Sequence, residues 1–170
     1  MLFRSATYNY IGSGAGSKQF YIKSGNIQSE IFVTDDCYWI EKSSSTNNYV
    51  VTGGTLTING GVFEFTKGSS NSNFYLNIPK SHLPLSDFLN KELIIKADII
   101  SFNATQLRMT AFTNDGTEWS SPQIIDVSAI GTIENRINIP SNTTQIRIRF
   151  DIYGNENDNV VFKDFRFILN

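Results

Sequence analysis

The stretch that decides the fold reads QLRMTAFTNDGTEW over residues 106–119. Apolar and polar residues alternate along its first half, which predicts a strand with Leu107, Met109 and Ala111 facing a core. An Asp-Gly pair then lies between β-rich segments. This pair favours a two-residue type I′ turn, because both central positions of that turn need a positive φ. We therefore expect a β-hairpin here.

The non-core face of this hairpin carries large side chains. With Asp115 and Gly116 as the loop, Phe112 would lie opposite Trp119, and Arg108 would share their face. An indole and a guanidinium on the polar side of a strand require an explanation. We take this face as the first candidate for a binding surface.

Length and charge exclude several classes of protein. A chain of 170 residues fits one domain and can bury about 70% of its unfolded surface. The formal net charge of −2 gives no bulk attraction to phosphate backbones, so no nucleic-acid partner is expected. The first residues lack the apolar run of a secretory signal peptide, and no later stretch is apolar enough to insert into a membrane. The single cysteine, Cys37, cannot form an internal disulfide and is expected to be a buried thiol.

The chain divides into two parts. Residues 1–34 contain the flexible run Gly12–Ser17 and are interpreted as lead-in strands or an attachment arm. They could equally be the first strands of the domain that follows. Residues 35–170 show turn signals about every ten residues, together with abundant Phe, Tyr, Ile, Val and Thr, which is typical of antiparallel sheets.

The clearest alternation in the chain lies near its end. Between residues 144 and 153, four apolar residues face inward: Ile146, Ile148, Phe150 and Ile152. Four others face outward: Arg147, Arg149, Asp151 and Tyr153. The final strand, Val160–Leu169, is apolar on both faces and should be central. One short helical turn is expected at 86–90, with Ser86 as its N-cap.

These patterns predict an all-β fold. Strands with one apolar and one polar face, no interleaved helices and no repeat indicate an antiparallel β-sandwich, with a jelly roll as the first topology. On the outward faces we expect seven ligand-binding residues: Trp119, Arg108, Phe112, Tyr75, Arg147, Arg149 and Tyr153. Alternatively, the arginines could simply pair with Asp98, Glu92 or Asp151 across a solvated sheet. The aromatic residues could be covered by another lobe, and Trp39 could belong to the core.

Catalytic and metal sites have little support in the sequence. His82, the only histidine, lies in a Pro-bounded turn without a nucleophile motif, and no carboxylate pair can be identified. Asp35-Asp36 and Asn155–Asn159 offer oxygen ligands but lack a calcium-loop pattern, so solvated turns are favoured. We expect no enzyme, no catalytic residue, no metal ligand and no cofactor.

The second half of the chain resembles the jelly-roll carbohydrate-binding modules appended to bacterial glycanases. The resemblance covers about Asp35 to Asn170. It rests on a helical turn leading into Asn90–Asp98, the hairpin with a Trp after its Asp-Gly pair, Ile139-Pro140-Ser141, and the closing strand from Val160. That strand commonly carries two aspartates in the family. Lys163 replaces the first and Asp164 matches the second, which speaks against the structural calcium that many members hold.

The resemblance implies binding of a cell-wall or cell-surface polysaccharide. Sugar rings present apolar C–H faces and hydroxyl rims, which suit exposed aromatic platforms bordered by polar groups. Arginines on the same face would suit an anionic glycan. Similar modules occur in baseplates and tail fibres of phages that infect Gram-positive bacteria. We therefore expect a non-catalytic host-adhesion component in a virion, or otherwise outside the cell as part of a larger assembly.

A second hypothesis makes the chain a structural or assembly module of a virion or multidomain protein. Its partners would then be other virion proteins, and the same face would be buried against one of them. A third hypothesis is a glycoside hydrolase, which would need a carboxylate pair in a cleft.

Overall fold

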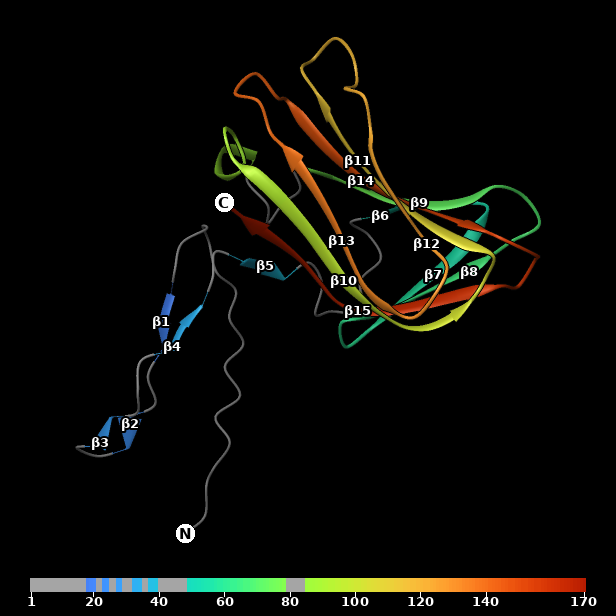
Figure 1. Cartoon of the computed structure of the whole chain (residues 1–170), viewed down its shortest axis with the longest axis horizontal. Helices are drawn as coiled ribbons and strands as arrows, with labels where there is room; N and C mark the ends of the chain where they lie inside the picture. The colour runs from blue at the N-terminus through green and yellow to red at the C-terminus, as the bar shows by residue number, and fades with distance from the viewer. Residues whose placement is uncertain are drawn as a thin grey trace.

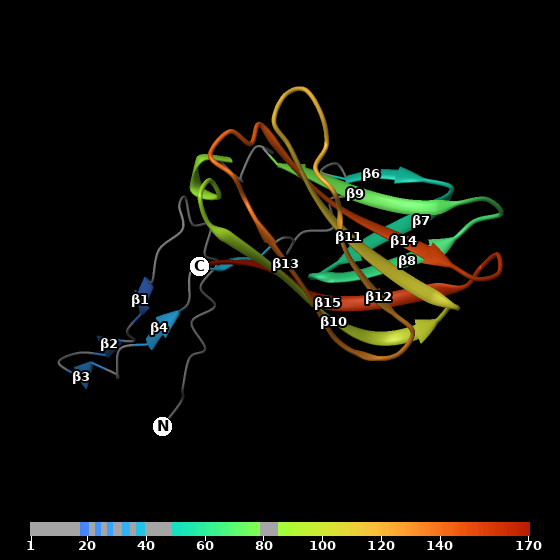
Figure 2. The same cartoon turned by 45° about the horizontal axis from the view of Figure 1, so that its top comes forward.

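The computed structural model describes residues 49–78 and 85–170 in full, together with the backbone of five short strands that precede them. Two antiparallel sheets form the body of the protein (Figures 1 and 2). Among the fully described residues the only helix is a single 3-10 turn. The expected all-β sandwich is therefore confirmed.

The five-stranded sheet has the order β12-β11-β14-β9-β6. Its strands are β6 (Tyr49–Thr52), β9 (Ser72–Ile78), β11 (Gln106–Asn114), β12 (Gln123–Val127) and β14 (Gln145–Tyr153). The expected hairpin partners, β11 and β12, lie at one side, and β14 is the middle strand. This order places the outward side chains of β11, β14 and β9 next to one another.

The second sheet has the order β13-β10-β15-β8-β7, with β5 also paired to β15. Its strands are β5 (Cys37–Trp39), β7 (Gly54–Asn59), β8 (Val62–Lys67), β10 (Glu92–Asn103), β13 (Gly131–Asn138) and β15 (Asn159–Leu169). The closing strand β15 has β10 on one side and both β8 and β5 on the other. Its central position is confirmed, but only one of its faces is apolar and buried. The other face carries Lys163 and Arg166 as well as Val161 and Ile168, so the expectation of two apolar faces was wrong.

Four short strands precede the sandwich. β1 (Lys18–Phe20) pairs with β4 (Phe32–Thr34), and β2 (Lys23–Ser24) pairs with β3 (Ile27–Gln28). The division into a lead-in arm and a domain at residue 35 stays a prediction. The side chains of Cys37 and Trp39, and the whole of Gly12–Ser17, Asp35-Asp36 and His82, lie outside the described residues.

The core fills the space between the two sheets. The predicted inward residues of β11 and β14 are all buried. Alternate residues of β9 and β10 are buried with them: Phe74, Leu76 and Ile78, and Leu93, Ile95, Ala97 and Ile99. Phe74 is central among them, because its ring stacks on Phe150 at 4.9 Å and on Phe162 at 6.1 Å, and meets the edge of Phe65 at 4.9 Å. Phe74 and Phe150 come from one sheet and Phe65 and Phe162 from the other, so these rings join the two layers.

The helical turn is shorter than expected and begins earlier. It spans Leu85–Asp87 and directs Phe88 into the core. Ser86 lies inside the turn, where its hydroxyl donates to the Asp87 carboxylate at 3.5 Å, so its assignment as N-cap was wrong. Of the described residues, no helix is long and apolar enough to cross a membrane.

Replacing Phe74 tests this account of the core. Phe74→Ala should lower the free energy of unfolding by about 3–5 kcal/mol, because it opens a cavity at the contact between the sheets. Urea denaturation measures the change. Ile130→Ala, at a side chain that is 67% exposed, is the control and should change stability by less than about 0.5 kcal/mol. A Phe74→Ala loss no larger than that of the control would contradict this packing.

Candidate functional site

The outer face of the five-stranded sheet carries every predicted site residue. Strand register places Phe112 beside Arg147, and Arg149 beside Tyr75, on the side opposite the buried residues. Trp119 reaches the same face through an isolated bridge to Asn114. The structure therefore brings together Trp119, Arg108, Phe112, Tyr75, Arg147, Arg149 and Tyr153. We call this surface the outer face.

The turn before Trp119 differs from the expectation. Because Asn114 pairs with Trp119, the loop has four residues, 115–118, and not two. Gly116 has a φ of 102°, but Asp115 does not have the positive φ that a type I′ turn requires. The two-residue loop was therefore wrong. Trp119 lies opposite Asn114 instead of Phe112, while its face is as predicted.

Side-chain hydrogen bonds explain the longer loop. Asn114 Oδ1 accepts the Gly116 N–H at 2.8 Å. Asp115 Oδ1 accepts the Thr117 N–H at 2.9 Å, the Thr117 hydroxyl at 2.6 Å and the Glu118 N–H at 3.1 Å. Short polar side chains that bind nearby backbone groups compete with a tight hairpin turn. The hydroxyl of Thr117 is the main reason that the pKa of Asp115 falls from 3.8 to about 2.

Four residues form a continuous cluster near this loop. The rings of Phe112 and Trp119 meet edge to face, with centroids 6.1 Å apart. The guanidinium carbon of Arg147 lies 4.3 Å from the Trp119 ring and 4.4 Å from the Tyr75 ring, within cation–π range of both. Arg147 Nε donates to Asn77 Oδ1 at 2.9 Å. We call Phe112, Trp119, Arg147 and Tyr75 the aromatic–arginine cluster.

The other two arginines are bound to carboxylates. Arg108 donates to both oxygens of Asp126, through Nε at 2.7 Å and Nη2 at 3.0 Å, and its guanidinium carbon lies 5.5 Å from the Tyr153 ring. These hydrogen bonds hold the pKa of Asp126 below its ordinary value. Arg149 Nε donates to Asp151 at 2.9 Å.

The alternative prediction, in which the arginines pair with Asp98, Glu92 or Asp151, is only partly correct. Asp151 does pair with an arginine of this face, Arg149. Asp98 and Glu92 do not, because both lie on β10 in the other sheet. Asp98 accepts a hydrogen bond from the Thr132 hydroxyl at 2.8 Å, and Glu92 pairs with Arg136 at 3.3 Å.

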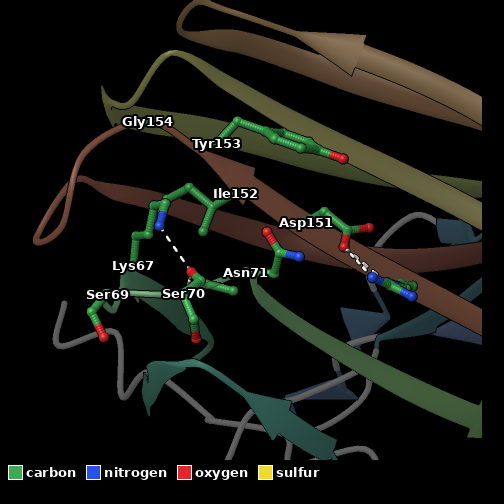
Figure 3. A pocket seen from close by; sticks show the side chains of 10 residues that line it. Lys67, Ser69, Ser70, Asn71, Asp151, Ile152, Tyr153 and Gly154 are labelled. Atoms are coloured by element: carbon green, nitrogen blue, oxygen red, sulfur yellow. Dashed lines mark hydrogen bonds and ion pairs between the residues drawn. The ribbon is translucent and has the colours of Figure 1, made fainter.

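A hollow of about 410 Å³ lies at the Tyr153 end of β14. Figure 3 shows its walls, formed by the turn between β8 and β9 and by the end of β14. Lys67 Nζ is fixed there by the carbonyl oxygens of Gly68 and Ser70, at 3.0 and 2.9 Å. Ser69, Asn71, Arg149 and Tyr153 also line the hollow. Sequence reasoning missed the Lys67 to Asn71 turn, because only the order of the strands brings it beside β14.

A smaller hollow, of about 190 Å³, lies beside Trp119, between the loop that carries it and the turn before β14. It is lined by Trp119 and by the carboxylate-bearing loop residues Asp115 and Glu118, with Pro140 and Asn142 from the turn before β14. The two hollows differ in charge, since two cations and one carboxylate, Lys67, Arg149 and Asp151, line the larger one and two carboxylates line the smaller one. The surroundings of the outer face therefore differ in charge between the Tyr153 end and the Trp119 end.

Comparison with known proteins gives structural neighbours only. No family model and no curated protein matches the sequence. The enzymatically active domain of tailspike protein 4 of bacteriophage CBA120 aligns with a TM-score of 0.58 and 10% identity, over 76% of this chain and 20% of the tailspike chain. A variant of a family 29 carbohydrate-binding module aligns with a TM-score of 0.53 and 14% identity, over 81% of this chain and 87% of the module.

A third neighbour is the Clostridium thermocellum xylanase 10B, a pair of family 22 carbohydrate-binding and family 10 glycoside hydrolase modules complexed with xylohexaose. Its TM-score is 0.53 at 15% identity, over 72% of this chain and 26% of the xylanase chain. The chain thus spans about a fifth to a quarter of these two longer proteins. The fold is a jelly roll.

The described residues that the sequence offered as calcium ligands have structural partners within the protein. Asp158 accepts the Asn155 N–H at 2.6 Å and so closes the turn between β14 and β15. Lys163 lies 3.8 Å from the Asp164 carboxylate, at the position where the resembling family has its first aspartate. In the described part of the chain, no three His, Cys, Asp or Glu side chains gather in a way that could hold a metal.

The loop hydrogen bonds give a direct test by NMR. Asp115 should titrate at about 2 in the wild-type protein. In Thr117→Val the hydroxyl donor is lost, so the pKa of Asp115 should rise toward 3.8, while the backbone donors keep part of the shift. Thr132→Val, which removes a hydroxyl on the other sheet, should leave the Asp115 titration unchanged. An unaltered Asp115 pKa in Thr117→Val would contradict the loop described here.

Proposed function

We propose that the chain binds a saccharide, without catalysis, through the outer face of the five-stranded sheet. The observation that carries this proposal is the aromatic–arginine cluster. Within the cluster, the side chain of Trp119 is 36% exposed, although tryptophan has a large apolar ring system. Tyr153, further along the outer face, is 39% exposed. Flat exposed rings beside fixed hydrogen-bond donors match the apolar faces and hydroxyl rims of sugar rings.

The dimensions of the face suit a ligand of several sugar rings. The outward positions of β14 from Arg147 to Tyr153 extend about 20 Å at about 3.3 Å per residue. The hollow with Lys67 lies at the Tyr153 end and the hollow with Glu118 at the Trp119 end. Among the neighbours, the xylanase modules hold a xylohexaose. We infer that an oligosaccharide, and not a single sugar, is the ligand.

The state of the carboxylates supports a binding role without catalysis. A glycosidase needs a general acid with a raised pKa and a second carboxylate across the bond to be cleaved. On the outer face, Asp126 and Asp151 are each bound to an arginine, and the pKa of Asp126 is lowered. Asp126 is therefore not suited to donate a proton near neutral pH.

We further propose that the chain works in a phage tail or baseplate, where it would grip the host cell wall. The similarity of its fold to part of a phage tailspike supports this setting. The purified chain should then bind whole bacterial host cells. Binding that periodate oxidation of the cells abolishes, and that protease treatment leaves intact, would identify a surface saccharide as the receptor. The reverse pattern would contradict it.

Replacing Trp119 tests the site. Trp119→Ala should reduce saccharide affinity at least about fivefold, because the loss of one stacking ring removes about 1–3 kcal/mol of contact energy. Glycan-array binding followed by calorimetry measures the effect, and circular dichroism verifies the fold. Ile100→Ala is the control, since Ile100 is a 44% exposed apolar residue of the other sheet. Unchanged affinity in folded Trp119→Ala would place the site elsewhere.

A second candidate function is assembly with a protein partner. One cross-strand row of the outer face ends in exposed apolar residues, Val50 at 41% and Ile124 at 46%. A partner could bury these residues together with the aromatic–arginine cluster. Light scattering of the chain with neighbouring virion proteins distinguishes the two functions. A monomer that binds saccharide and no partner would exclude assembly through this face.

A further inference from the structure

The three arginines of the outer face differ in their charge partners. Arg108 is bound to Asp126, and Arg149 is bound to Asp151. Arg147 makes no ion pair with any residue that the structure describes. The outward positions of the five strands thus hold three guanidinium groups and two carboxylates. One positive charge remains at Arg147, although the chain as a whole has a formal charge of −2.

Arg147 is also held in one orientation. Tyr75 contacts its guanidinium from β9 on one side of β14, and Trp119 contacts it from beyond β11 on the other side. Its Nε is occupied by Asn77. The two terminal nitrogens have no hydrogen-bond acceptor among the described residues. Their N–H groups are therefore available to a ligand, and little side-chain entropy would be lost on binding.

The immediate neighbours of Arg147 carry no negative charge that would repel an anionic ligand group. The adjacent outward residues along β14 are Gln145 and Arg149, and the residues directly across are Phe112 and Asn77. None of these is a carboxylate. Asp115 and Glu118 line the small hollow beside Trp119, which Arg147 does not line. An anion at the terminal nitrogens of Arg147 would thus meet no immediate repulsion.

We propose that the saccharide carries an anionic group, a carboxylate or a phosphate, and that Arg147 is the residue that binds it. A planar guanidinium can donate two parallel hydrogen bonds to either group, and such charge-assisted bonds are about twice as strong as those to neutral oxygens. Arg108 and Arg149, already neutralised, would contribute less. This inference rests on the proposed saccharide function and deepens it by naming the ligand class.

A glycan array with matched probes tests the inference on the full chain. It should carry oligogalacturonates, their carboxyl-reduced neutral counterparts, and glycerol-phosphate polymers bearing sugars. The wild-type protein should bind one anionic class at least about tenfold more tightly than the neutral probes, and this preference should weaken as salt is raised. Preferred binding of the oligogalacturonates would identify a carboxylate as the group recognised, and preferred binding of the glycerol-phosphate polymers would identify a phosphate.

Variants then assign the preference to Arg147. Arg147→Gln should lose this preference, so that anionic probes bind no more tightly than neutral probes. Arg147→Lys keeps the charge but not the planar pair of terminal N–H donors, so it should retain only part of the preference. Arg136→Gln, at an ion-paired arginine of the other sheet, is the control and should keep the full preference. Thermal unfolding verifies that each variant is folded.

The outcomes separate the two proposals. Equal binding of anionic and neutral probes, or a preference that survives in folded Arg147→Gln, would overturn the inference and leave saccharide binding standing. Absence of binding to every probe on the array and to host cells would overturn the proposed function itself. An anionic preference that is lost only in the Arg147 variants would establish both.

Discussion

The alternation of side chains along β14 is the constraint on which the rest of the structure depends. Each inward Ile or Phe of this strand is buried between the sheets, so each outward residue is fixed on the opposite side. A slip of one residue would bury Arg147 and Arg149 and expose four core residues, at a cost that no surface contact could offset. Because β14 is the middle strand, it imposes the same choice of face on β11 and β9. The core thereby determines which side chains form the outer face.

This dependence explains how much could be predicted from the sequence. Whether a residue occupies an odd or an even position in its strand decides which face of the sheet it lies on, and this parity can be read from the local sequence. The faces of Arg108, Phe112, Tyr75 and Arg147 therefore followed from alternation alone. Trp119 kept its predicted face even though the loop is two residues longer, since a shift of two positions preserves parity. The loop itself could not be predicted from its Asp-Gly pair, because the side chains of Asn114 and Asp115 accept backbone N–H groups that a type I′ turn would have placed elsewhere. The Thr117 hydroxyl adds a hydrogen bond to the Asp115 carboxylate.

Features that depend on strand order were out of reach. Nothing local indicates that the turn after β8 lies beside the end of β14, so Lys67 and Asn71 were missed as walls of the larger hollow. The same limit applies to the partners of the arginines. Asp98 and Glu92 have suitable charge and spacing in sequence, but β10 belongs to the other sheet. Asp126 is not among the partners expected from the sequence, although pairing of β12 with β11 places it directly opposite Arg108.

The environment of Arg147 differs from what stability alone would favour. A carboxylate opposite an arginine on a sheet surface contributes about 0.2–1 kcal/mol, and the chain places one beside Arg108 and one beside Arg149. At Arg147 the positions across are instead Phe112 and Asn77, neither of which carries a negative charge. Asn77 orients the guanidinium by accepting a hydrogen bond from its Nε. The absence of one ion pair on an exposed sheet surface lowers the stability of the fold only slightly. It leaves a positioned cation between the exposed ring of Trp119 and the half-buried ring of Tyr75. Such a group gains most of its interaction energy when an anion arrives from outside the chain.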